Sequence, residues 1–361
     1  MAKAHAPSSG EAGATPAADP VPAGESRPRR HRLRAAIIFL VIVVALFLIL
    51  PRLAGQAHAV DLIRDASWGF LVLGVVVETV SLVFYSMLFR RLLGLLQFPV
   101  TLALALRINL AGLAAAHLFS AGGVGGAAVT YRVLQKRGMS HSLVLIAVIF
   151  QNAFAYSVLF LLFGIGLLAL VLRGEANDLA MAVAAALVTL LLTLSVYGFW
   201  LLNHPTSLRR RGRQVVDWLG RRSSRLRVSY QRLDEWLDGV VDGWRRLRRD
   251  GRGHLRTVGH SAGYWGFDIL CLLAVMLAFH QWVPVYYVLI AYGVANVVGT
   301  FSPTPGGLGA VEAVMIALLA GFGMGSSAAV AVVLVYRLIN FWLPIPAGLI
   351  TYTSLRKASQ T

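Results

Sequence analysis

Four ionisable side chains stand inside long apolar stretches of this sequence, where a charge needs a partner or a ligand. Glu78 and Asp268 are flanked by apolar residues, and Glu312 and Arg337 lie closer to the C-terminal end. A charge at the centre of a bilayer costs roughly 2.5 to 3.5 kcal/mol on insertion scales, so such residues mark substrate paths, proton relays or buried ion pairs. A guanidinium suits a bidentate grip on phosphate, whereas a carboxylate can bind a cation, carry a proton or pair with the arginine.

These charges accompany two glycine-rich motifs that repeat within the chain. The motif "SAGGVGGAAV" at residues 120–129 aligns with "TPGGLGAVEA" at residues 304–313. Proline ends a helix because it lacks the amide donor, glycines let the backbone turn tightly, and the amides that start the next helix attract anions. Each motif therefore predicts a broken helix with a binding site at the break, the alternative being a glycine-rich packing kink. The backbone positions of this predicted site are Gly122, Gly123, Pro305, Gly306 and Gly307.

Other polar residues lie close to the same motifs. Arg132 follows the first motif, where it can bind phosphate or anchor the chain at the membrane interface. We expect His117, Asn109 and Asn296 to satisfy backbone groups that the broken helices set free. The sequence contains no metal-ligand spacing, nucleophile elbow or phosphate-binding loop with its lysine, so we expect no enzyme active site, cofactor or metal.

The elements that carry these residues must be membrane helices. The chain of 361 residues is 57% hydrophobic and 14% charged, with runs such as "AMAVAAALVTLLLTLSVYGFWLL". A hydrocarbon core about 30 Å thick is crossed by roughly 20 apolar residues at about 1.5 Å each, a length that several runs reach. The single cysteine, Cys271, excludes a disulfide or a cysteine metal site within this sequence. The sequence therefore predicts an all-α polytopic membrane protein.

The net charge of +17 indicates membrane orientation rather than nucleic-acid binding, because lysine and arginine concentrate in separate clusters. These clusters lie at residues 27–34, 90–91, 131–137, 209–256 and 356–357. With every cluster on the cytoplasmic side, both termini are cytoplasmic and the chain crosses the cytoplasmic (plasma) membrane in six full spans. The predicted spans are 35–53, 67–89, 141–171, 179–202, 258–281 and 326–351.

Two further stretches, 99–131 and 284–323, must begin and end on the same side of the membrane, and the glycine motifs interrupt them halfway. We predict that both are re-entrant helical hairpins, since broken backbone at membrane depth is tolerated where it packs in protein or lines a wet cavity. One hairpin enters from the cytoplasm and the other from outside. The two halves therefore form an inverted repeat of about eight membrane segments, an architecture of many transporters.

The basic cluster between the two halves predicts an amphipathic loop. Apolar residues recur there at helical spacing between the arginines, with Trp218, Trp236 and Trp244 among them. We expect a basic amphipathic helix that binds anionic phospholipid, the alternative being a helix pair packed on the membrane domain; no nucleic-acid partner is expected. The predicted parts of the chain are a disordered cytoplasmic tail at 1–33, a first membrane half at 34–203, the loop at 204–257, a second membrane half at 258–352 and a cytoplasmic tail at 353–361.

Three motifs give most of the chain a resemblance to a known family. The motifs "SPTPGGLGAVEA", "SAGGVGGAAVTYRVLQKRGMS" and "YRLINFWLPIPAG" resemble those of the flippase-like family named for the transmembrane region of lysylphosphatidylglycerol synthase. The resemblance implies a unit that moves phospholipid between leaflets, as the membrane part of the multiple peptide resistance factors is thought to do. Arg132 matches the family's arginine, but this sequence reads "GGAAVTYR" where many relatives carry an acid after the glycines. We further expect a stand-alone member without the synthase domain, because the sequence ends shortly after the last predicted span.

These features predict a lipid translocase that moves a phospholipid or lipid-linked headgroup between leaflets. In this hypothesis the hairpin tips meet near the midplane, Arg337 or Arg132 holds the phosphate, and Glu312 handles a cationic group or a proton. The alternatives are a secondary transporter of a small solute and a non-transporting scaffold for envelope assembly. Membrane lipids are the expected partners, and a homo-oligomer or a partner in envelope synthesis is left open.

Overall fold

The computed structural model of the protein describes residues 65–118, 124–174, 178–222, 230–249 and 251–357. All described residues belong to one compact unit within Phe47–Thr361. The predicted tail at 1–33, the predicted span at 35–53 and the glycines Gly122 and Gly123 lie outside the described residues.

Long helices carry most of the described chain. Four of them are α3 (Trp68–Leu95), α6 (His141–Leu172), α7 (Asp178–Asn203) and α10 (Gly251–Ala278). A last long helix consists of α13 (Ser326–Arg337), the π-helical turn η2 (Leu338–Trp342) and α14 (Pro344–Lys357). The segments long and apolar enough to cross a membrane are Trp68–Leu95, His141–Leu172, Gly253–Ala278 and Ser326–Leu355. Four predicted spans are thus confirmed, α7 carries the segment predicted at 179–202, and no strand occurs among the described residues.

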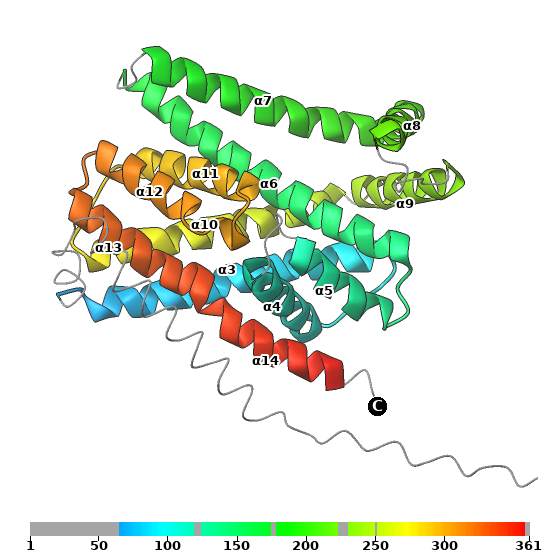
Figure 1. Ribbon diagram of the computed structural model, residues 1–361, viewed down its shortest axis with the longest axis horizontal. Coiled ribbons are helices and arrows are strands. Elements are labelled where there is room, and N and C mark those ends of the chain that lie inside the picture. Colours follow the sequence, from blue (N-terminus) through cyan, green and yellow to red (C-terminus); the bar gives the residue numbers. More distant parts are fainter. Residues whose placement is uncertain (1–64, 119–123, 175–177, 223–229, 250, 358–361) are drawn as a thin grey trace, which may run out of the picture. The chain divides into compact units, whose positions relative to one another are not determined.

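Each glycine motif separates two shorter helices that pack against each other. The first pair is α4 (Leu102–Leu118) with α5 (Val124–Gln135), and the second is α11 (Val285–Phe301) with α12 (Ala310–Gly321) (Figure 1). Helices of 17 and 12 residues are about 26 and 18 Å long, less than a hydrocarbon core of about 30 Å. Between α11 and α12 lies the short turn η1 (Pro305–Gly307), where the prolines and glycines predict the break.

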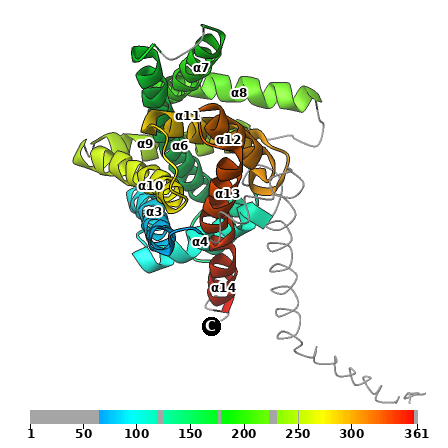
Figure 2. The same cartoon turned by 90° about the vertical axis from the view of Figure 1, so that its left-hand side faces the viewer.

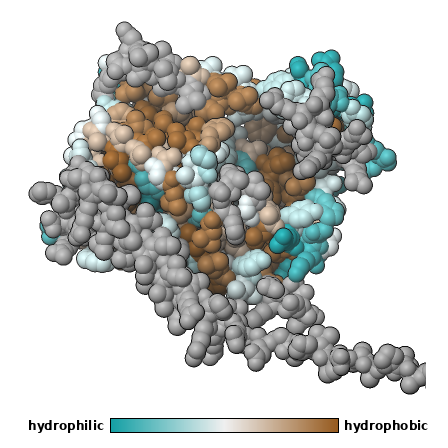
Figure 3. Space-filling view, in the orientation of Figure 1, coloured by the Kyte–Doolittle hydropathy of each residue, from teal (hydrophilic) through white to brown (hydrophobic). Residues whose placement is uncertain are grey.

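Helices that are distant in the sequence pack side by side. α3 packs along α10, α14 packs on α4, and α6 contacts both α10 and α11 (Figures 1 and 2). Large apolar side chains of α3 and α6 are exposed, among them Val72, Leu161 and Leu168, and Figure 3 shows apolar residues over much of the visible surface. A surface of this kind suits lipid better than water.

The basic loop forms two helices, α8 (Pro205–Arg222) and α9 (Tyr230–Arg249), and α10 begins at Gly251, before the predicted boundary at residue 258. The apolar face of α9 is covered by protein: Leu237, Val240 and Trp244 are buried, and α9 contacts α6 and α10. The loop therefore adopts the helix pair of the alternative interpretation, because the face expected to lie in the leaflet is already packed. Binding of anionic phospholipid to the loop stays a prediction.

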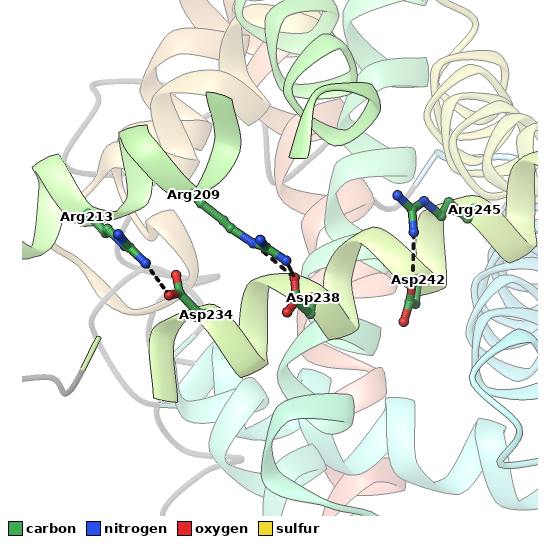
Figure 4. Close-up of polar contacts among 6 residues, drawn as sticks. All are labelled: Arg209, Arg213, Asp234, Asp238, Asp242 and Arg245. Carbon is green, nitrogen blue, oxygen red and sulfur yellow. Dashed lines mark hydrogen bonds and ion pairs between the residues drawn. The ribbon is translucent and has the colours of Figure 1, made fainter. Parts of the chain in front are cut away.

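Ion pairs join α8 to α9 (Figure 4). Arg209 pairs with Asp238, and Arg213 pairs with Asp234 at 2.5 Å. Its hydrogen bond to the aspartate raises the pKa of each arginine, because the bond favours the charged guanidinium. Both arginines are largely exposed, and exposed ion pairs contribute little and are screened by salt. The buried face of α9 must therefore hold the helix pair in place.

We expect the double substitution of Asp234→Asn and Asp238→Asn to loosen α8 while α9 stays docked. Amide hydrogen exchange in lipid nanodiscs should rise in α8 by a few-fold at most, and high salt should have the same effect on the unmodified protein. The matched control is Asp242→Asn, which removes an exposed pair with Arg245 inside α9 and should leave α8 unchanged. Faster exchange throughout α9 would contradict the apolar docking.

Candidate functional site

A cavity of about 570 Å³ lies among the helices of the bundle. Its walls come from α3, α4, α5, α6, α10, α11, η1, α12, α13 and η2, so both pairs of short helices contribute. Its lining is rich in neutral amides and hydroxyls, such as those of Tyr85, Asn109, Gln151, Tyr264, Asn296 and Thr300. Glu78, Asp268, His117 and Arg337 add ionisable groups. A polar cavity among apolar helices can hold a hydrophilic group that hydrocarbon would exclude.

Asp268 on α10 is the centre of a buried hydrogen-bond network. Its carboxylate accepts hydrogen bonds from the hydroxyl of Tyr292 at 2.6 Å, the hydroxyl of Tyr336 at 2.8 Å and Nδ2 of Asn340 at 3.0 Å. The same amide of Asn340 donates to Oε1 of Glu78 at 3.4 Å. The two acids of α3 and α10, which are far apart in the sequence, therefore meet in one group at the cavity wall.

Glu312 and Arg337 form a buried ion pair, one of the roles that the sequence left open for the glutamate. Nε of Arg337 lies 2.5 Å from Oε1 of Glu312, and both side chains are only 8% exposed. Nη2 donates to the carbonyl of Gly306 at 3.2 Å, and the guanidinium lies 4.3 Å from the centre of the Phe341 ring. Arg337 lines the cavity, whereas Glu312 is not among the lining residues. The positive charge that Arg337 brings to the cavity wall is therefore already neutralised by Glu312.

The start of α12 is capped by its own glutamate. The N–H of Gly309 donates to Oε2 of Glu312 at 2.7 Å, which places the carboxylate at the positive end of the helix. Gly306 adopts a φ of 55°, and a Cβ there would overlap the ring of Phe341. Glycine is required at this position for both reasons. The helix start that was expected to attract an anion thus already has a carboxylate partner.

The π-helical turn η2 places Asn340 beside the two acids. Pro344 has no amide hydrogen to donate to the carbonyl of residue 340, so the regular hydrogen-bond pattern stops there. Instead the N–H of Leu343 donates to the carbonyl of Leu338, five residues earlier, at 2.9 Å. Such wide turns occur frequently at functional sites. The Trp-Leu-Pro sequence of the last span therefore accounts for the position of the amide that joins the two acids.

The structure brings together most, but not all, of the predicted site residues. Arg132 is exposed on α5 and does not line the cavity, so it does not join Arg337 there. Gly306 and Gly307 line the cavity and Pro305 precedes them in η1. Of the side chains expected to satisfy freed backbone groups, His117 bonds to the carbonyl of Phe341 in the wide turn η2. Asn109 and Asn296 bond to the carbonyls of Tyr85 and Tyr292, which lie within α3 and α11 and not at a break.

The sequence analysis missed Tyr292, Tyr336 and Asn340. Tyr336 and Asn340 flank Arg337 in "YRLIN", and three polar residues so close together within an apolar span were a signal that could have been used. Tyr292 offered no such signal, because one aromatic residue in an apolar stretch is typical of ordinary packing.

The chain matches the family described as the lysylphosphatidylglycerol synthase TM region over residues 35–348. It belongs to this family. Among its relatives, a UPF0104 membrane protein of Pyrococcus horikoshii is 25% identical over 332 residues, covering 89% of this chain and 97% of the relative. A UPF0104 membrane protein of Methanothermobacter thermautotrophicus is 23% identical over 319 residues, covering 86% and 92%. Inner membrane protein YbhN of Escherichia coli is 33% identical over 86 residues, covering 24% and 27%. Together with the apolar spans, family membership makes the protein a multi-pass integral membrane protein and confirms the resemblance seen in its motifs.

Proposed function

We propose that this protein is a lipid translocase that moves a phospholipid or lipid-linked headgroup between the leaflets of the cytoplasmic membrane. The observation that carries the proposal is the polar cavity inside a bundle with an apolar surface. A headgroup can pass through such a cavity while its acyl chains stay in lipid, so that the polar part avoids hydrocarbon. Membership of a family named for a lipid synthase's transmembrane region supports a lipid substrate.

In this proposal the two pairs of short helices are re-entrant hairpins that enter from opposite sides of the membrane. Their lengths fall short of a full crossing, and both pairs contribute backbone to the cavity through Gly112, Gly126, Gly299 and Gly307. With six full spans they give about eight segments and an inverted repeat, in which rocking of one half against the other alternates access.

The lining suggests how a headgroup is held. Amide and hydroxyl side chains supply neutral hydrogen bonds to a polar headgroup. Arg337 contributes a guanidinium with five N–H donors, of which Nε and Nη2 contact Glu312 and Gly306, so other donors remain for a phosphate oxygen. Phosphate binding then falls to Arg337 alone, since Arg132 does not line the cavity.

One relative supports the choice of membrane, and the distribution of charge supports the orientation. The Escherichia coli relative is named an inner membrane protein, which supports the cytoplasmic membrane for this chain. By the positive-inside rule, the arginines of α8 and α9 support a cytoplasmic position for that side of the protein, and the proposal puts both termini there as well. Val215 and Trp218 of α8 are more than half exposed, so α8 is the part of the loop that we expect to contact anionic phospholipid.

The test compares two substitutions at neighbouring positions of α5. Ala127 lines the cavity, whereas Ala128 is exposed on another face of the helix. We expect Ala127→Trp to slow leaflet exchange of labelled phospholipids or glycolipids in proteoliposomes by about tenfold or more, because the ring occupies space that the headgroup needs. Ala128→Trp should leave exchange unchanged. Equal rates in the two variants, or uptake of a water-soluble solute without lipid exchange, would contradict the proposal.

A further inference from the structure

The buried charges of the bundle do not balance. Glu78, Asp268, Glu312 and Arg337 are 3%, 2%, 6% and 7% exposed, and no other Asp, Glu, Lys or Arg is buried among the described residues. The ion pair with Arg337 neutralises Glu312. Two carboxyl groups therefore remain without a cation of their own, and an uncompensated charge at this depth is strongly unfavourable. A bound cation, such as a proton, must therefore neutralise at least one of these two carboxyl groups.

The hydrogen bonds of the two carboxyl groups differ sharply. Asp268 accepts three bonds of 2.6 to 3.0 Å, from Tyr292, Tyr336 and Asn340, which suits an ionised carboxylate. Glu78 accepts one long bond of 3.4 Å from Asn340, and its Oε2 is buried without any donor. An oxygen without a donor is what a protonated carboxyl needs, because its own O–H donates instead.

The two acids also share one hydrogen-bond donor. The amide of Asn340 donates to both carboxyl groups and holds them at the cavity wall. Two ionised carboxylates that share one donor in a buried site repel each other, so a proton on one of the pair is favoured. The donor set of Asp268 assigns that proton to Glu78.

We propose that Glu78 and Asp268 form a proton site that loads and releases one proton through the cavity, with Glu78 as the proton carrier and Asp268 as the ionised carboxylate beside it. Asn340 positions the two groups. The role of this proton site in coupling rests on the proposed function, since movement of the proton would drive movement of the headgroup through the same cavity. The site differs from the ion pair of Glu312 and Arg337, which has a complete set of partners.

Other titratable groups face this site from the surrounding helices. Besides Tyr292 and Tyr336, they are Tyr85, His117, Tyr156, Tyr264, Cys271 and Arg337. Of these, only Arg337 carries a permanent positive charge, and Glu312 already pairs with it. His117 ordinarily titrates near neutral pH, but it stacks on the Phe341 ring over which Arg337 lies, and a second positive charge there is disfavoured. The carboxyl pair is therefore the group at this wall that exchanges a proton with the cavity.

The first experiment detects the proton on the carboxyl group without measuring transport. Infrared spectra of the purified protein in lipid nanodiscs should contain the C=O stretch of a protonated carboxyl at neutral pH. We expect Glu78→Gln to remove this band and the exposed control Glu235→Gln to keep it. Should Glu78→Gln not fold, Asn340→Ala tests the same site, because loss of the shared donor must shift the band. A band that persists in Glu78→Gln, or stays in place in Asn340→Ala, overturns the proposal.

The second experiment measures coupling. A pH gradient across proteoliposomes should bias the leaflet distribution of the transported lipid by about tenfold per pH unit for one proton per lipid. Glu78→Gln should abolish the bias, and Glu235→Gln should retain it. A bias driven by a sodium gradient but not by a pH gradient would overturn the proton assignment in favour of a metal cation.

The outcomes separate this inference from the proposed function. Lipid exchange that does not depend on the pH gradient, in a protein without the carboxyl band, would overturn the proton site. The same result would still support the proposed translocase. A band lost in Glu78→Gln, in a protein that exchanges no lipid, would support the proton site and refute the translocase.

Discussion

Glu312→Gln is expected to lower the free energy of unfolding by about 3 to 5 kcal/mol, the usual cost of removing one partner of a buried ion pair. The substitution would leave the guanidinium of Arg337 buried at the cavity without its carboxylate, which now lies 2.5 Å away. It would also weaken the cap at Gly309, whose N–H donates to the same carboxylate.

The double variant of Glu312→Gln and Arg337→Met should recover much of this loss, because replacing both partners by uncharged groups of similar size is often nearly neutral. Unfolding by denaturant in mixed micelles would measure both variants. The control is Asp242→Asn, which breaks an exposed pair and should leave stability unchanged. A single variant as stable as the unmodified protein would show that Arg337 finds another partner.

The same double variant separates structure from transport. Stability that recovers without lipid exchange would mean that Arg337 contacts the headgroup, as the proposed function requires. If both stability and lipid exchange recover, the ion pair serves only to hold α12 against α13. The structure favours the first outcome, because Arg337 lines the cavity and Glu312 does not.

The sequence was most informative where a residue type restricts the backbone. The prolines and glycines at residues 303–309 predicted the break between α11 and α12, and the apolar runs predicted the long spans. These features depend on local sterics and on length, which can be read without knowledge of neighbours. The sequence also offered the pairing of Glu312 with Arg337 as one role of the glutamate, because few charges occur in the membrane segments and opposite charges attract strongly there.

Features that depend on distant packing could not be predicted. Glu78 and Asp268 lie on different helices, and their meeting through Asn340 requires both the packing of α3 along α10 and the wide turn η2. The apolar face of α9 had the pattern of a lipid-binding helix, and that pattern does not distinguish a protein surface from a leaflet. Arg132 matched a family motif, but its position on α5 directs it away from the cavity lining.

Gly348→Ala and Gly266→Ala should change stability in opposite directions although the substitution is the same. A Cβ at Gly348 of α14 would overlap the carbonyl oxygen of Leu110 and lie 2.5 Å from Cβ of Ala114, both on α4. Backbone cannot move aside as a side chain can, so we expect a loss of about 1 to 3 kcal/mol or more. A Cβ at Gly266 of α10 meets no atom within 4 Å, and alanine there should add about 0.5 to 1 kcal/mol through its better helix propensity.

The opposite signs would identify the contact between α4 and α14 as close packing that leaves no room for an added atom. Helix α4 carries His117, whose Nδ1 bonds to the carbonyl of Phe341 at 3.0 Å and whose ring stacks on that of Phe341. Forcing α14 away from α4 should therefore also disturb Arg337, since its guanidinium lies over the Phe341 ring. Melting temperatures and lipid exchange measured on both variants would check this: Gly348→Ala should lower both, and Gly266→Ala should raise the melting temperature with exchange unchanged. Equal melting temperatures would mean that the two helices separate without cost.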